Sequence, residues 1–243
     1  MLVETMTERE KLKYLVGIEE KINSIASRIV MRTCLHKKKG AWESLGTRSI
    51  VLNGNRYYYS IKAQRVSTGG RIRFSIECLP YVVLTRDNGR KYILNFDTLR
   101  SEKSLKVYEL HVFERYRERF LKNTDISLTE SIRIFFERNN LGRIIVGKKA
   151  KVGYVKIIDD GVLMCDDEVS TLKTNTIHWK TFITEEMLFE DQSHLSKYGI
   201  FWEEFSSLLK SWNEDRHTGT KRLNQSLDHG IAFLREDLER EDV

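Results

Sequence analysis

The sequence predicts an α+β protein: an N-terminal helix, an antiparallel β-meander, two helices packed on a second antiparallel meander, and a helical C-terminal region. Three observations lead to this class. Apolar residues recur every three or four positions near the N-terminus, residues 47–96 alternate apolar and polar side chains around Asn-Gly turns, and helical spacing returns after residue 184. No internal repeat is visible.

The N-terminal helix is predicted from a capping box and an apolar seam. Thr7 and Glu10 have the spacing of a capping box. The apolar residues that follow at alternating intervals of three and four are Leu15, Ile18, Ile22, Ile25 and Ile29. We expect an amphipathic helix of about seven turns that ends near Arg32 and packs on the body of the protein. A homodimer through the helix 7–32 is the alternative.

Residues 47–96 predict four or five antiparallel strands joined as a meander. Asn53-Gly54 and Asn88-Gly89 are dipeptides that favour hairpin turns. The segments beside them are rich in β-branched and aromatic residues, and a further segment alternates apolar and polar side chains. The expected strands are 49–52, 57–61, 71–79, 81–85 and 92–96.

The second half of the chain predicts two helices, a second meander and a helical end. The two helices are 106–122 and 127–139, the second capped by Ser127 with Glu130 as its partner. The expected strands are 143–146, 152–158, 162–169 and 176–183, with Asp159-Asp160-Gly161 as one turn, and the C-terminal helices are 185–197, 201–213 and 219–240. We expect regions 1–100, 101–190 and 191–243, with one continuous domain as the alternative.

Composition predicts an ordinary globular protein, with 40% hydrophobic and 31% charged residues. No segment approaches the roughly 20 apolar residues that a membrane span needs, and charged residues interrupt the first apolar stretch, so we expect neither a span nor a secretory signal. Cys34, Cys78 and Cys165 are odd in number and far apart, which indicates a reducing compartment and a cytoplasmic protein. Cys34 and His36 are two potential ligands without a second pair, and Lys149 replaces the hydroxyl residue that a phosphate-binding loop over 142–149 would need, so we expect no metal and no cofactor.

The net charge of +6 is distributed unevenly along the chain. Residues 28–73 carry eleven Lys and Arg against one acid, residues 133–156 carry seven against one, and residues 159–243 carry nine against nineteen. A basic front favours a nucleic-acid partner, although basic side chains can also simply solvate exposed strands. The candidate nucleic-acid-binding residues are Arg56, Arg71, Arg73, Lys148, Lys149 and Lys151.

A spacing of four residues separates His111, Arg115 and Arg119 in His-Val-Phe-Glu-Arg-Tyr-Arg-Glu-Arg. On a helix, residues at this spacing rise along one face. A histidine exchanges a proton near neutral pH, and arginines bind phosphate through paired hydrogen bonds. The face therefore predicts cleavage of a phosphodiester without a metal, through a proton-transfer group and two phosphate clamps.

This motif, followed by a short capped helix and an antiparallel meander, resembles the barnase–EndoU–colicin–RelE-like group of small ribonuclease toxins. It is closest to the subgroup that opens with His-Ala-x-x-Arg-x-x-x-Arg-Ile, although Val112 is bulkier than that pattern prefers. The similarity covers about residues 105–190. It implies helices packed on a curved antiparallel sheet, and metal-independent cleavage of RNA to a 2′,3′-cyclic phosphate with His111 in acid–base catalysis.

The resemblance also implies a catalytic polar residue on the last strand, where Lys180 and Thr181 are the candidates. His178 supplies a possible second proton-transfer group beside His111, similar to the two-histidine arrangement of ribonucleases. In a straight strand His178 and Lys180 share a face that excludes Thr181. Geometry therefore favours Lys180 with His178, whereas the resemblance favours Thr181.

We expect a toxin-like endoribonuclease with RNA, rather than DNA, as its partner. One alternative is a non-catalytic nucleic-acid-binding module on the same basic surface. The other is a structural or regulatory protein of a mobile element, in which the helix face is only solvated. On that solvated face, Glu114 and Glu118 would pair with Arg117, Arg119 and Lys122.

Overall fold

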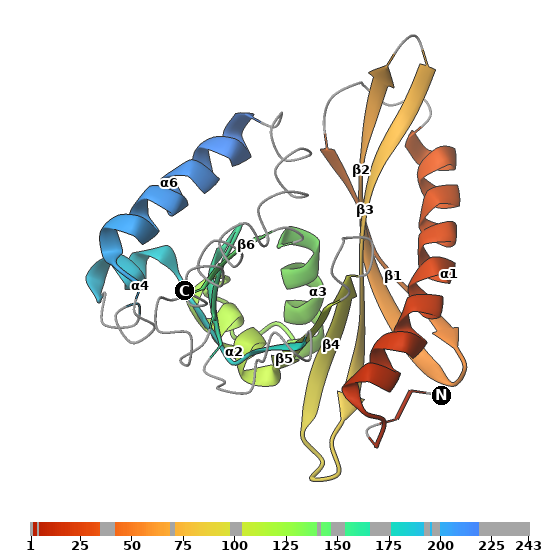
Figure 1. Cartoon of the computed structure of the whole chain (residues 1–243), viewed down its shortest axis with the longest axis horizontal. Coiled ribbons are helices and arrows are strands. Elements are labelled where there is room, and N and C mark those ends of the chain that lie inside the picture. Colours follow the sequence, from red (N-terminus) through yellow and green to blue (C-terminus); the bar gives the residue numbers. More distant parts are fainter. Residues whose placement is uncertain are drawn as a thin grey trace, which may run out of the picture.

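A computed structural model describes residues 2–3, 5–34, 42–68, 71–97, 104–139, 142–146, 154–165, 176–191, 195 and 200–218. Its order of helices and strands confirms the predicted α+β class (Figure 1). The helices are α1 (Glu8–Cys34), α2 (Leu110–Arg119), α3 (Leu128–Arg138), α4 (Glu185–Glu190) and α6 (Trp202–Thr218). The strands are β1 (Trp42–Leu52), β2 (Asn55–Thr68), β3 (Arg71–Thr85), β4 (Lys91–Asp97), β5 (Ser104–Glu109), β6 (Gly142–Val146), β7 (Tyr154–Ile158), β8 (Gly161–Cys165), β9 (Thr176–Trp179) and β10 (Thr181–Ile183).

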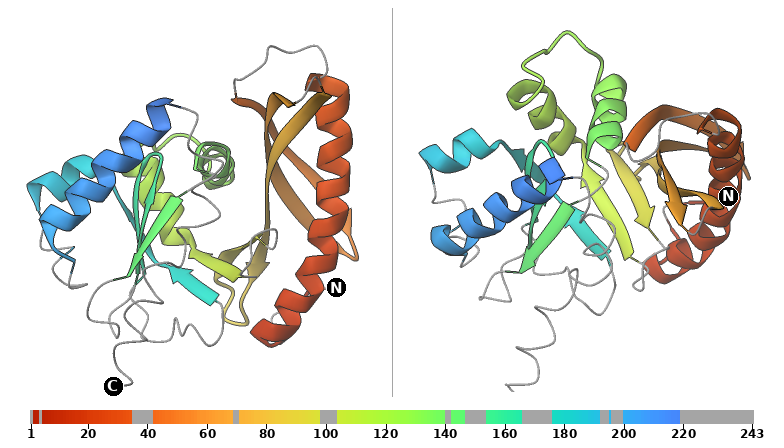
Figure 2. Two further views of the ribbon diagram at one scale, coloured as in Figure 1. Left: turned by 45° about the horizontal axis from the view of Figure 1, so that its top comes forward. Right: turned by 90° about the horizontal axis from the view of Figure 1, so that it is seen from above.

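Two open sheets organise the described chain. The first has the strand order β1-β2-β3-β4-β5-β9 and the second has the order β10-β8-β7-β6. Helix α1 covers one face of the first sheet, α2 and α3 lie between the two sheets, and α4 and α6 cover the outer face of the second (Figures 1 and 2). None of the described helices is long and apolar enough to cross a membrane.

Three clusters of buried side chains hold these layers together. The α1 cluster, between α1 and the first sheet, includes Leu15, Ile22, Tyr57, Ile61, Leu94 and Val107. The central cluster, between the two sheets, includes Tyr81, Ile93, Tyr108, Val112, Phe113, Tyr116, Phe135, Phe136, Trp179 and Phe182. The outer cluster, beneath α4 and α6, includes Val155, Val162, Met164, Ile183, Leu188, Phe205 and Leu209.

The predicted N-terminal helix and its cap are confirmed. The Oγ1 of Thr7 accepts a hydrogen bond from the backbone N–H of Glu10 at 3.3 Å, and a Glu10 carboxylate oxygen accepts one from the backbone N–H of Thr7 at 2.8 Å. These bonds satisfy two backbone donors at the start of the helix. The apolar seam of α1 packs against the first sheet, as predicted.

The predicted antiparallel meander is also confirmed, and it extends from β1 to β5. Asn53 and Gly54 both have positive φ, 51° and 81°, as a two-residue type I′ turn requires. The two strands expected on either side of Pro80 form the single strand β3. Pro80 cannot donate to the ladder, but its carbonyl accepts a hydrogen bond from the Asn95 side chain at 2.8 Å.

The predicted helix 106–122 was wrong at its beginning. Residues 104–109 form strand β5, and the helix begins only at Leu110. Val107 packs in the α1 cluster while Tyr108 packs in the central cluster, so the side chains alternate between two buried faces as they do in a strand. Pairing with β4 and β9 outweighs the local helical pattern.

The predicted strand 176–183 is divided between the two sheets. Residues 176–179 form β9, which pairs in parallel with β5, and residues 181–183 form β10, which pairs with β8. At Lys180 the chain passes from one sheet to the other, and the Lys180 N–H donates to the Met164 carbonyl at 3.0 Å. Because β5 and β9 continue the sheet built by β1–β4, the expected division at residue 100 falls inside one sheet.

The capped helix α3 and the helical C-terminal region agree with the sequence in type and differ in extent. Ser127 caps α3 by accepting from the Glu130 N–H at 3.1 Å. The helix expected at 185–197 ends at Glu190, where Asp191 adopts an extended backbone, whereas α6 continues to Thr218. The expected helix 219–240 lies outside the described residues.

Gly161 begins β8 beside β10, its neighbour in the second sheet. A Cβ at this position would lie 2.6 Å from the Ile183 carbonyl oxygen and 2.8 Å from the Phe182 ring. Gly161→Ala is therefore expected to lower the free energy of unfolding by about 1–3 kcal/mol in urea denaturation, because the packed backbone has to shift. Gly17→Ala on α1 is the control, since no atom lies within 4 Å of its new Cβ, and it should stabilise by about 0.5–1 kcal/mol. Equal stability of the two variants would contradict the prediction.

Candidate functional site

Helix α2 presents a polar flank beside a fully buried one. Val112, Phe113 and Tyr116 are buried in the central cluster. His111 and Arg115 lie on the flank, with 48% and 38% of their side chains exposed. His111 and Arg115 are therefore neighbours, as their spacing predicted, because they lie four positions apart in one helix.

His111 is held between a carboxylate and a guanidinium. Its Nδ1 lies 3.5 Å from a Glu114 carboxylate oxygen, and its Nε2 accepts the Nε–H of Arg115 at 3.1 Å. This geometry fits a neutral imidazole with its proton on Nδ1 and a lone pair on Nε2. Nε2 is therefore the atom of His111 that can take a proton.

Arg115 connects His111 to a second carboxylate. Its Nη1 donates to a Glu118 carboxylate oxygen at 2.8 Å while its Nε–H is directed at His111. Glu114 and Glu118 thus pair with His111 and Arg115, not with the basic residues expected on a purely solvated face. The result is a row of alternating acidic and basic groups, Glu114, His111, Arg115 and Glu118, along one exposed flank.

Arg119, the third residue of the motif, is directed at the backbone. Its Nη1 donates to the Phe182 carbonyl of β10 at 2.6 Å. Partial burial, with the nearby charge of Arg115, lowers the pKa of the Arg119 guanidinium from its ordinary value. The contact ties the end of α2 to the edge strand of the second sheet, which is a structural position for a residue expected to clamp phosphate.

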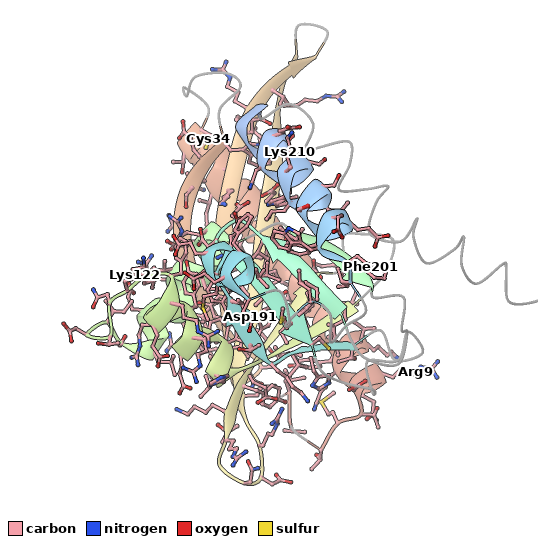
Figure 3. The ribbon with its side chains drawn as sticks, turned by 90° about the vertical axis from the view of Figure 1, so that its left-hand side faces the viewer. Arg9, Cys34, Lys122, Asp191, Phe201 and Lys210 are labelled. Carbon is pink, nitrogen blue, oxygen red and sulfur yellow. The ribbon has the colours of Figure 1, made fainter. Side chains whose placement is uncertain are left out.

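Replacing Arg119 should therefore change stability. Arg119→Ala is expected to lower the free energy of unfolding in urea by about 1–2 kcal/mol, because the Phe182 carbonyl loses a charge-assisted donor. Lys122→Ala is the matched control: Lys122 is exposed at the outer edge of the α2–α3 region (Figure 3), and its removal should cost less than about 0.5 kcal/mol. Two variants of equal stability would refute this structural role of Arg119.

Lys180 and Thr181 lie alongside α2. Trp179 is paired with Tyr108, just before the helix, and the Phe182 carbonyl receives Arg119 at its end. The chain between Trp179 and Phe182 therefore runs beside the helix in the same direction. Thr181 pairs with Met164 of the outer cluster, so its side chain lies on the face of the second sheet opposite to Phe182.

His178 lies on the face of the first sheet that α1 covers. It is paired with Val107, whose side chain packs in the α1 cluster, and its Nε2 is 3.7 Å from a carboxylate oxygen of Glu8. His111, by contrast, extends from α2 on the opposite face of that sheet. The structure does not bring the two expected histidines together.

The candidate nucleic-acid-binding residues are spread over the chain. Arg56 and Arg73 are both exposed, but they lie near opposite ends of the paired strands β2 and β3. The side chain of Arg71 is outside the described part of the structure, and so are Lys148, Lys149 and Lys151. Arg56 and Arg73 therefore cannot act as one compact patch.

The sequence pattern places Asp160 only in a turn, but the structure makes it the centre of a buried hydrogen-bond network. Its carboxylate, 1% exposed, accepts from the Tyr116 hydroxyl at 2.7 Å, from two nitrogens of Arg138 at 2.7 Å each, and from the Asn139 amide at 3.0 Å. Burial, and then the Asp160 charge, raises the pKa of the Tyr116 hydroxyl. The network joins the buried side of α2 to the end of α3 and the β7–β8 turn.

The described residues show no cluster of metal ligands, and the Cys78 thiol is not activated. Among them, no three His, Cys, Asp or Glu side chains lie together as metal ligands do. Burial, with a smaller effect of the Glu19 charge, raises the pKa of the Cys78 thiol to about 12, so this thiol is not an activated nucleophile. The polar flank of α2 is the strongest candidate site.

Comparison with protein-family models, with curated proteins and with solved structures gave no match. The chemistry of the α2 flank is therefore the feature of this protein that points to a function.

Proposed function

We propose that this protein is a metal-independent endoribonuclease that cleaves RNA to a 2′,3′-cyclic phosphate. The observation that supports the proposal is the Glu114–His111–Arg115 arrangement on α2. It combines a proton acceptor of defined orientation with a cation suited to phosphate, and both side chains are accessible from solvent.

In the proposed reaction, Nε2 of His111 takes the proton of an RNA 2′-hydroxyl. The 2′-oxygen attacks the adjacent phosphorus, a new 2′-O–P bond forms, and the P–O5′ bond breaks. Lys180, whose backbone runs beside α2, is our candidate for the acid that gives a proton to the leaving 5′-oxygen. Glu114 orients the imidazole and stabilises its positive charge after the proton has moved.

Arg115 has two roles in this proposal. In the free protein its Nε–H occupies Nε2 of His111. A guanidinium can bind a phosphate through two charge-assisted hydrogen bonds. An arriving phosphate should therefore draw Arg115 away from the imidazole. The same movement would free the base and neutralise charge on the phosphate.

The test uses oligonucleotides that differ in one hydroxyl. A DNA strand with a single internal ribonucleotide is incubated with the protein in EDTA, beside the all-deoxy strand. Cleavage only 3′ of the ribonucleotide, with a cyclic phosphate detected by mass spectrometry, is the expected result. Cleavage of both strands, or cleavage that requires a divalent metal, would contradict the proposal.

Two other outcomes would favour the alternatives. Salt-sensitive RNA binding without cleavage indicates a nucleic-acid-binding module. If the protein neither binds nor cleaves RNA, a structural or regulatory role is indicated.

A cytoplasmic location fits an RNA substrate and three free cysteines, Cys34, Cys78 and Cys165. Dimerisation through α1 stays a prediction, and it would have to use the outer face of the helix because the seam is buried.

A further inference from the structure

Three exposed cations lie at one end of the first sheet, close to the start of α2. Arg56 is the second residue of β2, and Arg90 and Lys91 lie at the β3–β4 hairpin, which projects at the foot of the sheet in Figure 1. Two exposed apolar side chains, Val51 and Val83, lie between and beside them, with exposed fractions of 56% and 36%. We call these five residues the foot surface.

Strand register places four residues of the foot surface, Val51, Arg56, Val83 and Lys91, on the same side of the sheet as α2, while Arg90 lies at the hairpin turn one residue before Lys91. Val83 pairs with Ile93, a member of the central cluster beneath α2, and Lys91 is two residues before Ile93 on the same face. Arg56 is the cross-strand neighbour of Val83, because the next residues, Tyr57 and Val82, are paired.

The same register leads from the foot surface to the candidate site. The row from Arg56 through Val83 and Ile93 leads to Tyr108, two residues before α2 begins. Three strand spacings separate Arg56 from Tyr108, or about 15 Å. Because Ile93 and Tyr108 are buried, a polyanion chain held at Arg56 and Lys91 would have to pass over the start of α2 to reach the exposed His111.

Charge pairing distinguishes these cations from their neighbour Arg86. Arg86 forms a bidentate ion pair with Glu109 and lies 5.1 Å above the Tyr92 ring. Within the described residues, Arg56, Arg90 and Lys91 have no acidic partner, and the side-chain bond of Arg56 goes to the neutral Ser49 hydroxyl at 3.4 Å. Unpaired cations beside exposed apolar side chains suit a phosphate backbone.

We propose that the foot surface binds the single-stranded RNA that leads to His111. The inference rests on the proposed function for the identity of the bound chain, and it adds the place where that chain lies. Phosphates would contact Arg56, Arg90 and Lys91. The exposed valines would lie under sugars or bases.

The test measures binding separately from cleavage. A fluorescent single-stranded RNA is titrated, in EDTA, into His111→Ala protein with and without Arg56→Gln, Arg90→Gln and Lys91→Gln. The triple variant should weaken binding about tenfold at low salt, and it should lower the slope of log Kd against log salt by about 2, since each single-strand phosphate contact contributes about 0.7.

The control removes the same charge from the opposite side of the sheet. Lys13→Gln, Lys21→Gln and Arg32→Gln alter three exposed cations of α1, and this triple variant should bind RNA like its parent. Equal weakening by both triple variants, or no RNA binding by the parent, would overturn the inference. If the foot variants alone weaken binding while the unmutated protein cleaves nothing, the RNA path stands and the ribonuclease proposal fails. If cleavage occurs and foot variants bind normally, only the path is refuted.

Discussion

His111→Ala is expected to reduce the rate of RNA cleavage by about 10²–10⁴-fold, because the variant lacks the proposed proton acceptor. RNA affinity should stay within about threefold, since Arg115 and the foot surface keep their charges. Thermal unfolding should also be unchanged, because the His111 side chain is half exposed and contacts only its own helix. Single-turnover cleavage of RNA in EDTA, with binding measured in parallel, checks all three expectations.

His178→Ala is the matched control for this prediction. His178 has a similar carboxylate neighbour, Glu8, but lies on the α1 side of the first sheet. Its replacement should leave cleavage unchanged. Loss of cleavage in His178→Ala with retention in His111→Ala would reverse the assignment, and loss in both would favour the two-histidine arrangement that the structure does not bring together.

Asp160→Asn is expected to destabilise the fold by about 2–4 kcal/mol. The variant keeps the shape of the side chain but removes the charge that Arg138 and the Tyr116 hydroxyl share. The buried Tyr116 hydroxyl then competes with Arg138 for a single amide oxygen, and one donor is left poorly satisfied. The half-exposed Arg138 can turn to solvent, which keeps the loss below that of a fully buried ion pair.

Urea denaturation of Asp160→Asn beside Asp125→Asn measures this effect. Asp125 is exposed between α2 and α3, so its variant should lie within about 0.5 kcal/mol of the parent. A double-mutant cycle with Tyr116→Phe should show a coupling of about 1 kcal/mol or more, because the two side chains share one hydrogen bond. Additive effects would show that Asp160 acts through Arg138 and Asn139 and not through Tyr116.

Features that depend on a few neighbouring residues followed from the sequence. The cap of α1 at Thr7, the cap of α3 at Ser127 and the turn at Asn53-Gly54 each involve residues no more than three positions apart. The contact between His111 and Arg115 belongs to the same class, since one helical turn joins them. The three-residue spacing of His111 and Glu114 also indicates that they are neighbours on the helix, but the sequence pattern placed Glu114 on a solvated face with other partners.

Features that depend on distant partners did not follow. Residues 106–109 have a helical pattern, yet β4 and β9 draw them into the sheet, and β9 lies some 70 positions further along the chain. The role of Arg119 required the position of β10, and the role of Asp160 required the packing of α2 against α3. A local pattern records which side chains recur, and it contains no information about which strand will pair with a given backbone.

The sequence by itself determined the α+β class, the capped helices, the hairpin meander and the histidine–arginine spacing of α2, because short-range sterics and hydrogen bonds govern each of them. The tertiary structure alone decided that His178 is separated from His111 by the first sheet, that Arg119 binds a strand carbonyl, and that Asp160 is a buried junction. Those outcomes follow from burial and long-range pairing, whose free energies exceed local propensity and exist only after the layers have packed.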